Sequence, residues 1–459
     1  MTTHPPTPGA PRTTSRRSLL TAVLAAPLAA TALSACGGSS GPGQPGGGGG
    51  GGGAGAGATI WYLTGDPKES IRDAYVEAFN ESSDGADLTP TAFQNDAYKT
   101  KIRTAVGAGQ APTIIYGWGG GGMRDFARAG QIEPLTGWLD ENPEVRDRLL
   151  ESTWAAATVD GEVYAMPNET VQPIVFFYNK RLFDQVGAQP PQTWDDLIGL
   201  VGTFNDAGIA PISLAGQSRW TTMMWLEFLF DRVGGPELFQ SIYDGQPEAW
   251  SNPDSLRALT MAQDLVRAGG FVDGFNSIVA DQNADQALLY TDRAAMMLHG
   301  TWTYGAMKAD GGDFVTGGNL GYANFPTVTG GKGDPGNSLG NPAQYFYLSA
   351  EASEEEKEVA RTFFAEGLMT DEVIDAFITE AGEVPVVTGI EDRFSLSDDQ
   401  EWMQFVYDVV SAAPSFQQSW DQALSPTAAE ELLTNIEQLF QLAITPEQFA
   451  ANMNAVLDA

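Results

Sequence analysis

The chain has 459 residues, of which 59 are acidic and 24 are basic, so its formal net charge is −35. A surface this acidic repels phosphate backbones and anionic lipid head groups, so no nucleic acid partner is expected. The length exceeds what one hydrophobic core usually supports and predicts at least two domains.

The first 36 residues have the composition of an export signal. Arg16 and Arg17 form a twin arginine, an apolar alanine-rich stretch follows at 19–35, and the segment ends in "LSAC" at Cys36. This order is typical of a secretory signal, and the twin arginine is typical of the route that exports folded proteins. "LSAC" resembles the bacterial lipobox, so we expect a signal over 1–36 with lipid attachment at Cys36. The alternative is an uncleaved membrane helix, for which the stretch is at the lower limit of length.

Cys36 is the only cysteine in the sequence, which excludes an intrachain disulfide and a sulfur-ligated zinc site. The Gly-rich segment 37–58 has no apolar periodicity and predicts a flexible tether. A body tethered through Cys36 would stay near the membrane yet rotate freely, which suits delivery of a ligand to a membrane partner.

From Thr59 onward the pattern predicts alternating strands and helices. The expected elements, in chain order, are a strand at 58–66, a helix at 70–80, a strand at 88–94, a helix at 98–106 and a strand at 112–117. Such alternation is typical of parallel βαβ units, whose ligands bind beyond the carboxyl ends of the strands. The loops expected at that edge are 62–66, 94–96 and 117–122.

The later part of the chain is richer in predicted helix. Thr193 stands three residues before Asp196, a capping-box pattern that predicts the start of a helix. Further elements are expected as buried strands at 293–302 and 344–350, and as helices at 353–369 and 430–443.

Several stretches match part of a catalytic motif but lack a residue that the motif requires. "GNSLG" at 336–340 matches G-x-S-x-G, but a loop precedes it, and no histidine follows Ser338 as such hydrolases require. His299 is the only histidine outside the export segment, and we interpret it as a hydrogen-bonded residue near the core. "GGKGD" at 330–334 lacks the Ser or Thr that follows Lys in a phosphate loop. No catalytic residue, metal or cofactor is therefore expected.

The four glycines after Trp118 let a backbone approach closely. No Lys or Arg stands among Gly117–Gly122, which makes a phosphate cradle a weak interpretation. We interpret the stretch as a strand-end loop reduced to backbone so that a sugar ring can lie against Trp118. Paired carboxylates leave a glycosidase open as an alternative. The acids in suitable loops are Asp66, Asp96, Glu169 and Glu383.

Tryptophans supply the strongest signal for a ligand. Trp138, Trp154 and Trp194 lie in helical contexts and are expected to pack. Another group stands at strand ends or in loops beside Gly or polar residues, where an indole can stack on a sugar ring. This group comprises Trp61, Trp118, Trp220 and Trp302.

Taken together, several stretches resemble the bacterial extracellular solute-binding proteins of family 1, the sugar-binding lipoproteins of ABC importers. The most specific run is "YAMP…FFYNKRLFDQVG…PQTWDDL" over 164–197, supported by "PTIIYGWGG", "DRAAMMLHGTW" and "GEVPVV". The resemblance implies a type II α/β fold with two lobes, three crossings and a ligand cleft between them. One lobe is expected at 59–168 plus 327–380, and the other at 172–321 plus 386–459. The expected crossings are 169–171, 322–326 and 382–385.

The resemblance also implies ligand-binding residues, with Trp220, Trp302 and Trp420 on the second wall of the cleft. The candidates are Trp61, Asp66, Asn95, Asp96, Trp118, Gly119, Glu169, Gln172, Arg219, Trp220, Trp302, Asn341, Gln344 and Trp420.

The expected function is a membrane-tethered monomer on the extracytoplasmic face that captures an oligosaccharide for an ABC permease. "YGWGGGG" resembles members that take short β-linked sugars such as xylobiose. The alternatives are a secreted glycosidase, a sugar-sensing binding subunit, and a protein that binds a charged solute. The last would need a cationic cluster, and only Lys99 and Arg219 lie near the expected site.

Overall fold

The computed structural model describes residue 1 and the ranges 57–83 and 87–457. The export signal over 1–36, the lipidation residue Cys36 and nearly all of the tether lie outside these ranges. Among the described residues, no helix has both the length and the apolar character that a bilayer span requires.

Five strands form a first sheet within the described ranges, in the order β2-β1-β3-β12-β6. Their bounds are Ala58–Leu63 for β1, Leu88–Phe93 for β2, Ile114–Gly117 for β3, Ala165–Asn168 for β6 and Gln344–Leu348 for β12. β1 pairs in parallel with β2 and β3, and the connecting helices are α1 (Lys68–Ser82) and α2 (Asn95–Gly107). The predicted parallel βαβ units are therefore confirmed.

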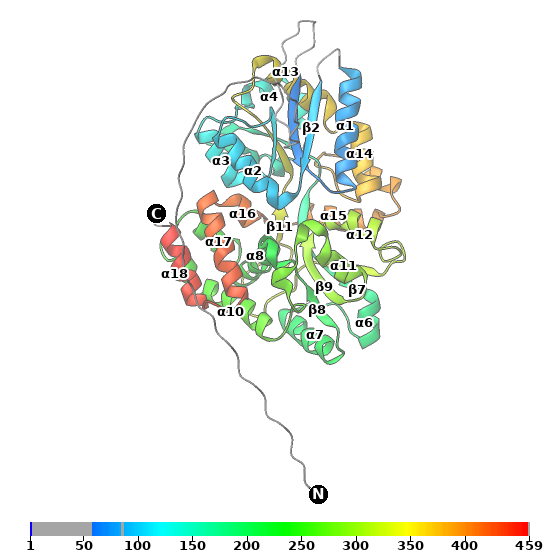
Figure 1. Ribbon diagram of the computed structural model, residues 1–459, viewed down its shortest axis with the longest axis vertical. Coiled ribbons are helices and arrows are strands. Elements are labelled where there is room, and N and C mark those ends of the chain that lie inside the picture. Colours follow the sequence, from blue (N-terminus) through cyan, green and yellow to red (C-terminus); the bar gives the residue numbers. More distant parts are fainter. Residues whose placement is uncertain (2–56, 84–86, 458–459) are drawn as a thin grey trace. The chain divides into compact units, whose positions relative to one another are not determined.

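A second sheet has the order β13-β11-β7-β9-β8, with β10 also paired to β7. Its strands are β7 (Gln172–Asn179), β8 (Ala210–Ser213), β9 (Ala294–Gly300), β10 (Leu320–Ala323), β11 (Ser338–Asn341) and β13 (Phe416–Gln418). Alternate residues of β7 enter different cores, because Phe176 packs in one hydrophobic cluster and Phe177 in the other. Figure 1 shows the first sheet in its upper half and the second sheet in its lower half.

Helices cover both sheets. They are α3 (Gly120–Arg128), α4 (Thr136–Glu141), α5 (Pro143–Asp147), α6 (Lys180–Val186), α7 (Trp194–Asp206), α8 (Trp220–Gly234), α9 (Pro236–Tyr243), α10 (Pro253–Arg267), α11 (Ala284–Tyr290), α12 (Thr303–Asp310), α13 (Glu354–Thr362), α14 (Asp371–Ala376), α15 (Gln400–Ser411), α16 (Trp420–Ala423), α17 (Pro426–Phe440) and α18 (Pro446–Leu457). The predicted capping box is present at the start of α7, where Thr193 and Asp196 satisfy each other's backbone N–H groups. A short hairpin, β4 (Thr158–Val159) and β5 (Glu162–Val163), lies outside the two sheets.

The structure corrects two expected lobe boundaries, and the first of them is at 322–326. Residues 327–341 were assigned to the first lobe, but β11 pairs with β7 and β13 in the second sheet. Arg232 of α8 also donates to the carbonyl of Asn337, and Val328 packs in the second core. The chain therefore crosses back between Asn341 and Gln344, and not at 322–326, because a four-residue strand could have joined either sheet.

The crossing at 169–171 lies beside the segment 384–386. The N–H of Val171 donates to the carbonyl of Val384, and the N–H of Val386 donates to the carbonyl of Glu169. Thr170 and Pro385 form an antiparallel bridge between these bonds. The chain beyond 385 does not cross there, because the N–H of Leu150 donates to the carbonyl of Val386 and the N–H of Thr388 donates to the carbonyl of Arg148. The expected crossing at 382–385 is therefore wrong, and this segment remains on the first lobe beside the crossing at 169–171.

A buried carboxyl supports the second lobe from within α8. Glu227 is fully buried, and its Oε1 accepts a hydrogen bond of 2.6 Å from the N–H of Trp420, at the start of α16. Burial raises the pKa of Glu227 to about 8. The folded protein therefore holds this proton at pH values where the unfolded chain has released it.

We expect this carboxyl to make folding less stable as the pH rises from 5 to 8. In that window the folded state binds one proton more than the unfolded state, so the free energy of unfolding falls by up to about 1.4 kcal/mol per pH unit. The Glu227→Gln variant keeps the acceptor oxygen without the titration and should show a weaker slope. Urea unfolding at several pH values measures both slopes, and equal slopes would contradict the assignment.

Candidate ligand cleft

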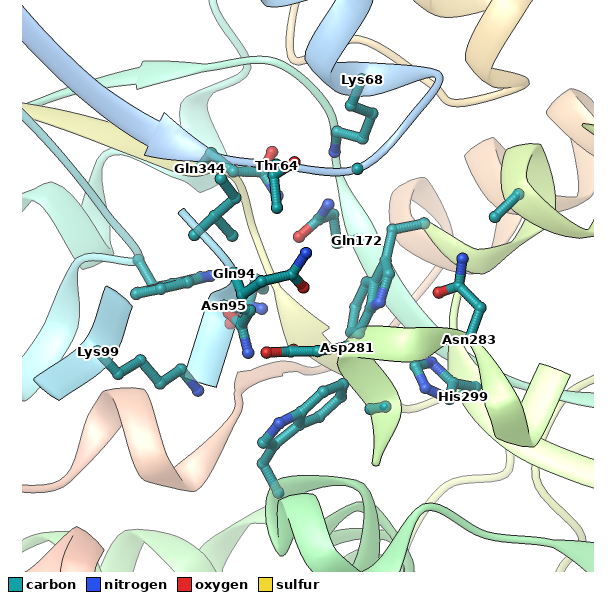
Figure 2. A pocket seen from close by; sticks show the side chains of 18 of the residues that line it. Thr64, Lys68, Gln94, Asn95, Lys99, Gln172, Asp281, Asn283, His299 and Gln344 are labelled. Carbon is teal, nitrogen blue, oxygen red and sulfur yellow. The ribbon is translucent and has the colours of Figure 1, made fainter. Parts of the chain in front are cut away.

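A cavity of about 220 Å³, called the main cavity below, lies between the two sheets (Figure 2). The first lobe lines it with the loops after β1, β2 and β3, because the carboxyl ends of these strands meet at one edge of the sheet. The second lobe contributes residues from α8, from the end of β9 and from α16. The flagged loops 62–66, 94–96 and 117–122 each place at least one residue on its wall.

Three indoles line the main cavity. Trp118 packs edge-on against Tyr116, with ring centroids 5.5 Å apart. Trp220 and Trp302 face it from the second lobe, with their centroids 6.2 Å apart. All three remain partly exposed, which leaves indole surface available to a ligand.

His299 fixes the two second-lobe indoles. Its ring centroid lies 5.5 Å from that of Trp220 and 5.5 Å from that of Trp302, in edge-on arrangements. Its Nδ1 accepts from the N–H of Gly300, and its Nε2 lies 3.3 Å from a carboxylate oxygen of buried Asp285. The histidine is buried, as predicted, but it also lines the cavity and positions two stacking surfaces there.

Side-chain amides surround the indoles. Figure 2 shows Gln94, Gln172 and Asp281 around the middle of the cavity, with Asn283 close to His299. Among the described residues, the side-chain oxygens of Asn341 and Gln286 are buried on this wall without a hydrogen-bond partner. Buried amide oxygens are rarely left unpaired, so these are suited to accept hydrogen bonds from ligand hydroxyls.

Charged groups at the cavity are mostly paired. Lys99 forms an ion pair of 2.9 Å with Asp421, and its ammonium lies 5.1 Å from the ring centroid of Trp118 and 5.8 Å from that of Trp220. Burial raises the pKa of Asp281, whose Oδ2 accepts from the N–H of Asp96. No group of three or more potential metal ligands occurs in the part of the chain that the structure describes.

A family model for the bacterial extracellular solute-binding proteins matches residues 64–370. The chain belongs to this family. Among its relatives is a probable sugar-binding periplasmic protein of Rhizobium meliloti, 27% identical over 72% of this chain and 76% of the relative. An uncharacterized ABC transporter extracellular-binding protein of Pyrococcus horikoshii is 24% identical over 55% of this chain, and the match spans 56% of that relative's length.

Solved structures give the same fold for this solute-binding protein. One, from work on xylan utilization by Caldanaerobius polysaccharolyticus, is 28% identical, with a TM-score of 0.78 over 87% of this chain and 99% of that chain. A chitin oligosaccharide binding protein is 24% identical, with a TM-score of 0.79 over 88% and 99% of the two chains. The predicted two-lobed α/β fold is thereby confirmed.

The sequence-predicted site residues divide into three groups. The main cavity brings together Asp66, Asn95, Trp118, Gln172, Trp220, Trp302, Asn341 and Gln344. Three others line a neighbouring cavity: Asp96, Gly119 and Arg219. Trp61, Glu169 and Trp420 line neither cavity.

The structure explains why Trp61, Trp420 and Glu169 do not line the cavities. Trp61 points to the side of β1 opposite buried Ile60 and Tyr62, and packs against Phe93, 4.9 Å away between centroids. Trp420 is fully buried in the second core, where it stacks on Phe239 with centroids 4.9 Å apart.

Glu169 is buried in an ion-pair cluster. Both of its oxygens accept from Arg72, at 2.8 Å each, and Lys68 lies 3.3 Å from Oε2. Lys68 also pairs with Glu383 at 3.1 Å, and Thr170 donates to the same Glu383 oxygen. Glu169 and Glu383 therefore hold the crossing at 169–171 and the segment beside it to α1, which removes both from the carboxylates considered for a glycosidase.

The four glycines are expected to leave room for a sugar, but protein backbone lies against Gly119, Gly120 and Gly121. A Cβ at Gly120 would overlap the carbonyl oxygen of Gln422, and a Cβ at Gly121 would overlap that of Leu424. Both carbonyls belong to the second lobe, at the end of α16. Only Gly122 faces open space. Gly120 and Gly121 are thus required by close contact between the lobes.

Other bonds join the lobes beside these glycines. The side chain of Gln418 donates to the carbonyl of Trp118 at 2.6 Å. Asp96 accepts from the indole N–H of Trp220 at 3.0 Å and from the hydroxyl of Ser218 at 2.8 Å. Asp96 is one of the predicted ligand-binding residues, but its carboxylate accepts hydrogen bonds from the second lobe.

Sequence reasoning missed several lining residues. Met223 and Met224 come from an apolar helix that carries no signal for a ligand. Asn283 directly precedes α11 and Gln286 lies in the first turn of that helix, where no motif identifies them as ligand-binding residues. Gln94 is the one of these residues that the sequence could identify as ligand-binding, because it directly follows β2 within the loop 94–96 that is expected at the cleft.

Proposed function

We propose that this solute-binding protein captures an oligosaccharide outside the cytoplasmic membrane and delivers it to the permease of an ABC importer. The observation that carries the proposal is the main cavity, where three indoles stand beside buried amide oxygens that lack partners. Indole faces stack on the apolar faces of sugar rings, and amides bond the hydroxyls at ring edges.

The comparisons favour a sugar among possible solutes. Relatives bear the name sugar-binding periplasmic protein, and a structural neighbour at 28% identity comes from work on xylan utilization. A short β-linked oligosaccharide such as xylobiose is therefore the ligand we propose. We further propose that the protein is a monomer, exported by the twin-arginine route and anchored through a lipid on Cys36.

The direct test is isothermal titration calorimetry with xylobiose, cellobiose, maltose and chitobiose. We expect binding of at least one of these sugars, and an affinity about tenfold lower in the Trp302→Ala variant, because one stacking surface is lost. Trp61→Ala is the matched control, since Trp61 lies outside both cavities, and should bind like the wild type. No heat with any sugar would overturn the proposal.

The same samples test the enzyme alternative. Asp66, Asp281 and Asp421 are the carboxylates that line the main cavity. After incubation with stoichiometric protein, a binding protein returns the sugar intact, whereas a glycosidase releases shorter products that chromatography detects. A sugar-sensing subunit would also return the sugar intact, and two permease genes beside this one would favour transport over sensing.

A further inference from the structure

The imidazole of His299 is held at both of its ring nitrogens. Its Nδ1 accepts a hydrogen bond of 2.9 Å from the N–H of Gly300, and its Nε2 lies 3.3 Å from Oδ2 of Asp285. Neither Nε2 nor this Oδ2 has a hydrogen-bond partner elsewhere among the described residues. A ring nitrogen that accepts a hydrogen bond carries no proton, so the contacts assign the proton of the neutral ring to Nε2, which faces the carboxyl group.

Other states of this imidazole would conflict with its surroundings. With the proton on Nδ1, one N–H would point at the N–H of Gly300, and Nε2 would face an oxygen of Asp285 with no proton between them. A ring rotated by half a turn would leave the N–H of Gly300 without its acceptor. His299 is only 2% exposed, so water cannot readily replace a lost partner. One tautomer and one orientation are therefore favoured.

Asp285 is itself fixed by two elements. It lies in the first turn of α11, is 1% exposed, and lines neither the main cavity nor the neighbouring one. Its Oδ1 accepts from the N–H of Gln286 at 3.0 Å, and its carbonyl oxygen accepts from the hydroxyl of Ser213, in β8, at 2.7 Å. This carboxyl group can therefore affect a ligand only through the residues that it holds.

The two indoles of the second lobe depend on the orientation of the imidazole. Trp220 and Trp302 meet the ring of His299 edge-on, with interplanar angles of 88° and 76°. Trp302 also packs directly over Gly300, where an added Cβ would lie 1.8 Å from the six-membered ring of the indole. A rotation of the imidazole would therefore displace two stacking surfaces at once.

We propose that Asp285 is a positioning residue of the sugar site, which holds His299 in one tautomer and thereby fixes the tilt of the indoles of Trp220 and Trp302. This rests on the proposed sugar-binding function. An indole stacks on a sugar ring only at a suitable angle, and indoles that are free to tilt must be ordered by the ligand at a cost in affinity. A buried partner that never touches the ligand removes this cost in advance.

The Asp285→Asn variant keeps the shape of the side chain but has one acceptor oxygen in place of two. It cannot accept from the N–H of Gln286 and from Nε2 of His299 together. Asp231→Asn is the matched control, because it makes the same change at another buried carboxyl group of this lobe that lines neither cavity. In calorimetric titrations with xylobiose, cellobiose, maltose and chitobiose, we expect about tenfold lower affinity for Asp285→Asn and a change within about twofold for Asp231→Asn.

A double-mutant cycle tests whether Asp285 acts through His299. The His299→Phe variant keeps a flat ring beside the indoles and removes both nitrogens. In that background, we expect Asp285→Asn to change the sugar affinity by less than about twofold, because the contact between the two side chains is already lost. A tenfold effect that persists there would show another route, such as the bond to Gln286, and would overturn the inference.

Nitrogen-15 NMR of histidine-labelled protein reads the tautomer without any sugar. The sequence has two histidines, and the spectrum of His299→Phe assigns the signal of His299. We expect a proton on Nε2 and none on Nδ1 in the wild type, and a mixture of tautomers in Asp285→Asn, whose amide can present either its oxygen or its NH₂ group to the ring. The wild-type spectrum keeps the test valid even if the variant does not fold.

Two results would overturn the inference: a proton on Nδ1 in the wild type, or equal sugar affinity in the wild type and Asp285→Asn. Absence of binding of every sugar to the wild type would instead overturn the proposed function. The tautomer is measured without sugar, so the two failures are distinguishable.

Discussion

Replacing Gly121 with alanine is expected to weaken sugar binding by about a hundredfold, although the residue does not line the main cavity. The added methyl would overlap the carbonyl oxygen of Leu424, which is backbone and cannot rotate away. The lobes would have to separate, and an overpacked contact of this kind costs about 3 kcal/mol. A ligand that must contact both lobes then has to supply that free energy, and its apparent affinity falls accordingly.

Gly122→Ala is a matched control one residue away. It places the same methyl group in the same helix, where nothing lies within 4 Å, so its affinity for a disaccharide should equal that of the wild type. Calorimetry gives the affinities, and small-angle scattering should show a wider hinge angle for Gly121→Ala alone. Equal affinity and equal hinge angle for both variants would show that this contact does not limit closure.

Replacing Arg72 with methionine is expected to cost about 3–5 kcal/mol of folding free energy, the largest effect on stability that we predict. Arg72 is buried and bonds both oxygens of Glu169, so its loss leaves a buried carboxylate with Lys68 as the remaining cation. Its Nη1 also donates to the carbonyl of Leu63 at 2.7 Å, and this bond is lost too.

Urea unfolding measures the effect, with Arg128→Ala as control. Arg128 also pairs with a carboxylate, Asp160, but both side chains are exposed, so its loss should leave the unfolding free energy unchanged. The double variant Arg72→Met with Glu169→Leu should recover much of the lost stability, because no unpaired charge remains. A small cost in the single variant would contradict a tightly coupled buried pair.

The same cluster predicts sensitivity to acid. Burial alone would raise the pKa of Glu169, but the charges of Arg72 and Lys68 outweigh it and hold this pKa below its usual range. The stabilisation is therefore complete above the unfolded pKa of about 4.5 and is lost as the pH falls through the lower folded value. The acid limb of the stability curve should flatten in the double variant.

Much of the first lobe could be predicted from the sequence. Strands such as β1 and β3 carry strong local signals, and the strand-end rule places their loops at the ligand cleft without knowledge of the distant chain. β11 shows the limit of this prediction, because the sequence of a four-residue strand does not indicate which sheet the strand joins. Its position depends on pairing with β7, more than 160 residues away in the chain.

The sequence predicts a site residue correctly when its position at the end of a strand places it in the cleft. It does not do so when the packing of distant segments determines which side chains face the cleft. Trp118 directly follows β3 and was found. Trp61 and Trp420 were also predicted to bind ligand, but Trp61 lies on the other side of β1 and Trp420 is buried in the second core. Gly121 is a further example. A glycine in the sequence indicates that another group packs closely against the backbone, but it does not indicate whether that group is a ligand or a protein segment.

The ion pairs of Lys68 with Glu169 and Glu383 restrict where a hinge between the lobes can lie. Glu169 stands in the crossing at 169–171 and Glu383 stands in the segment bonded to it, so both move with α1 and the first lobe. If one lobe rotates against the other, the axis must then pass between this ion-pair cluster and the second sheet, near the connection from Asn341 to Gln344. The ion pairs of Lys68 and Arg72 then stay within the anchored part, and opening breaks contacts between the lobes such as the hydrogen bond from Gln418 to the carbonyl of Trp118.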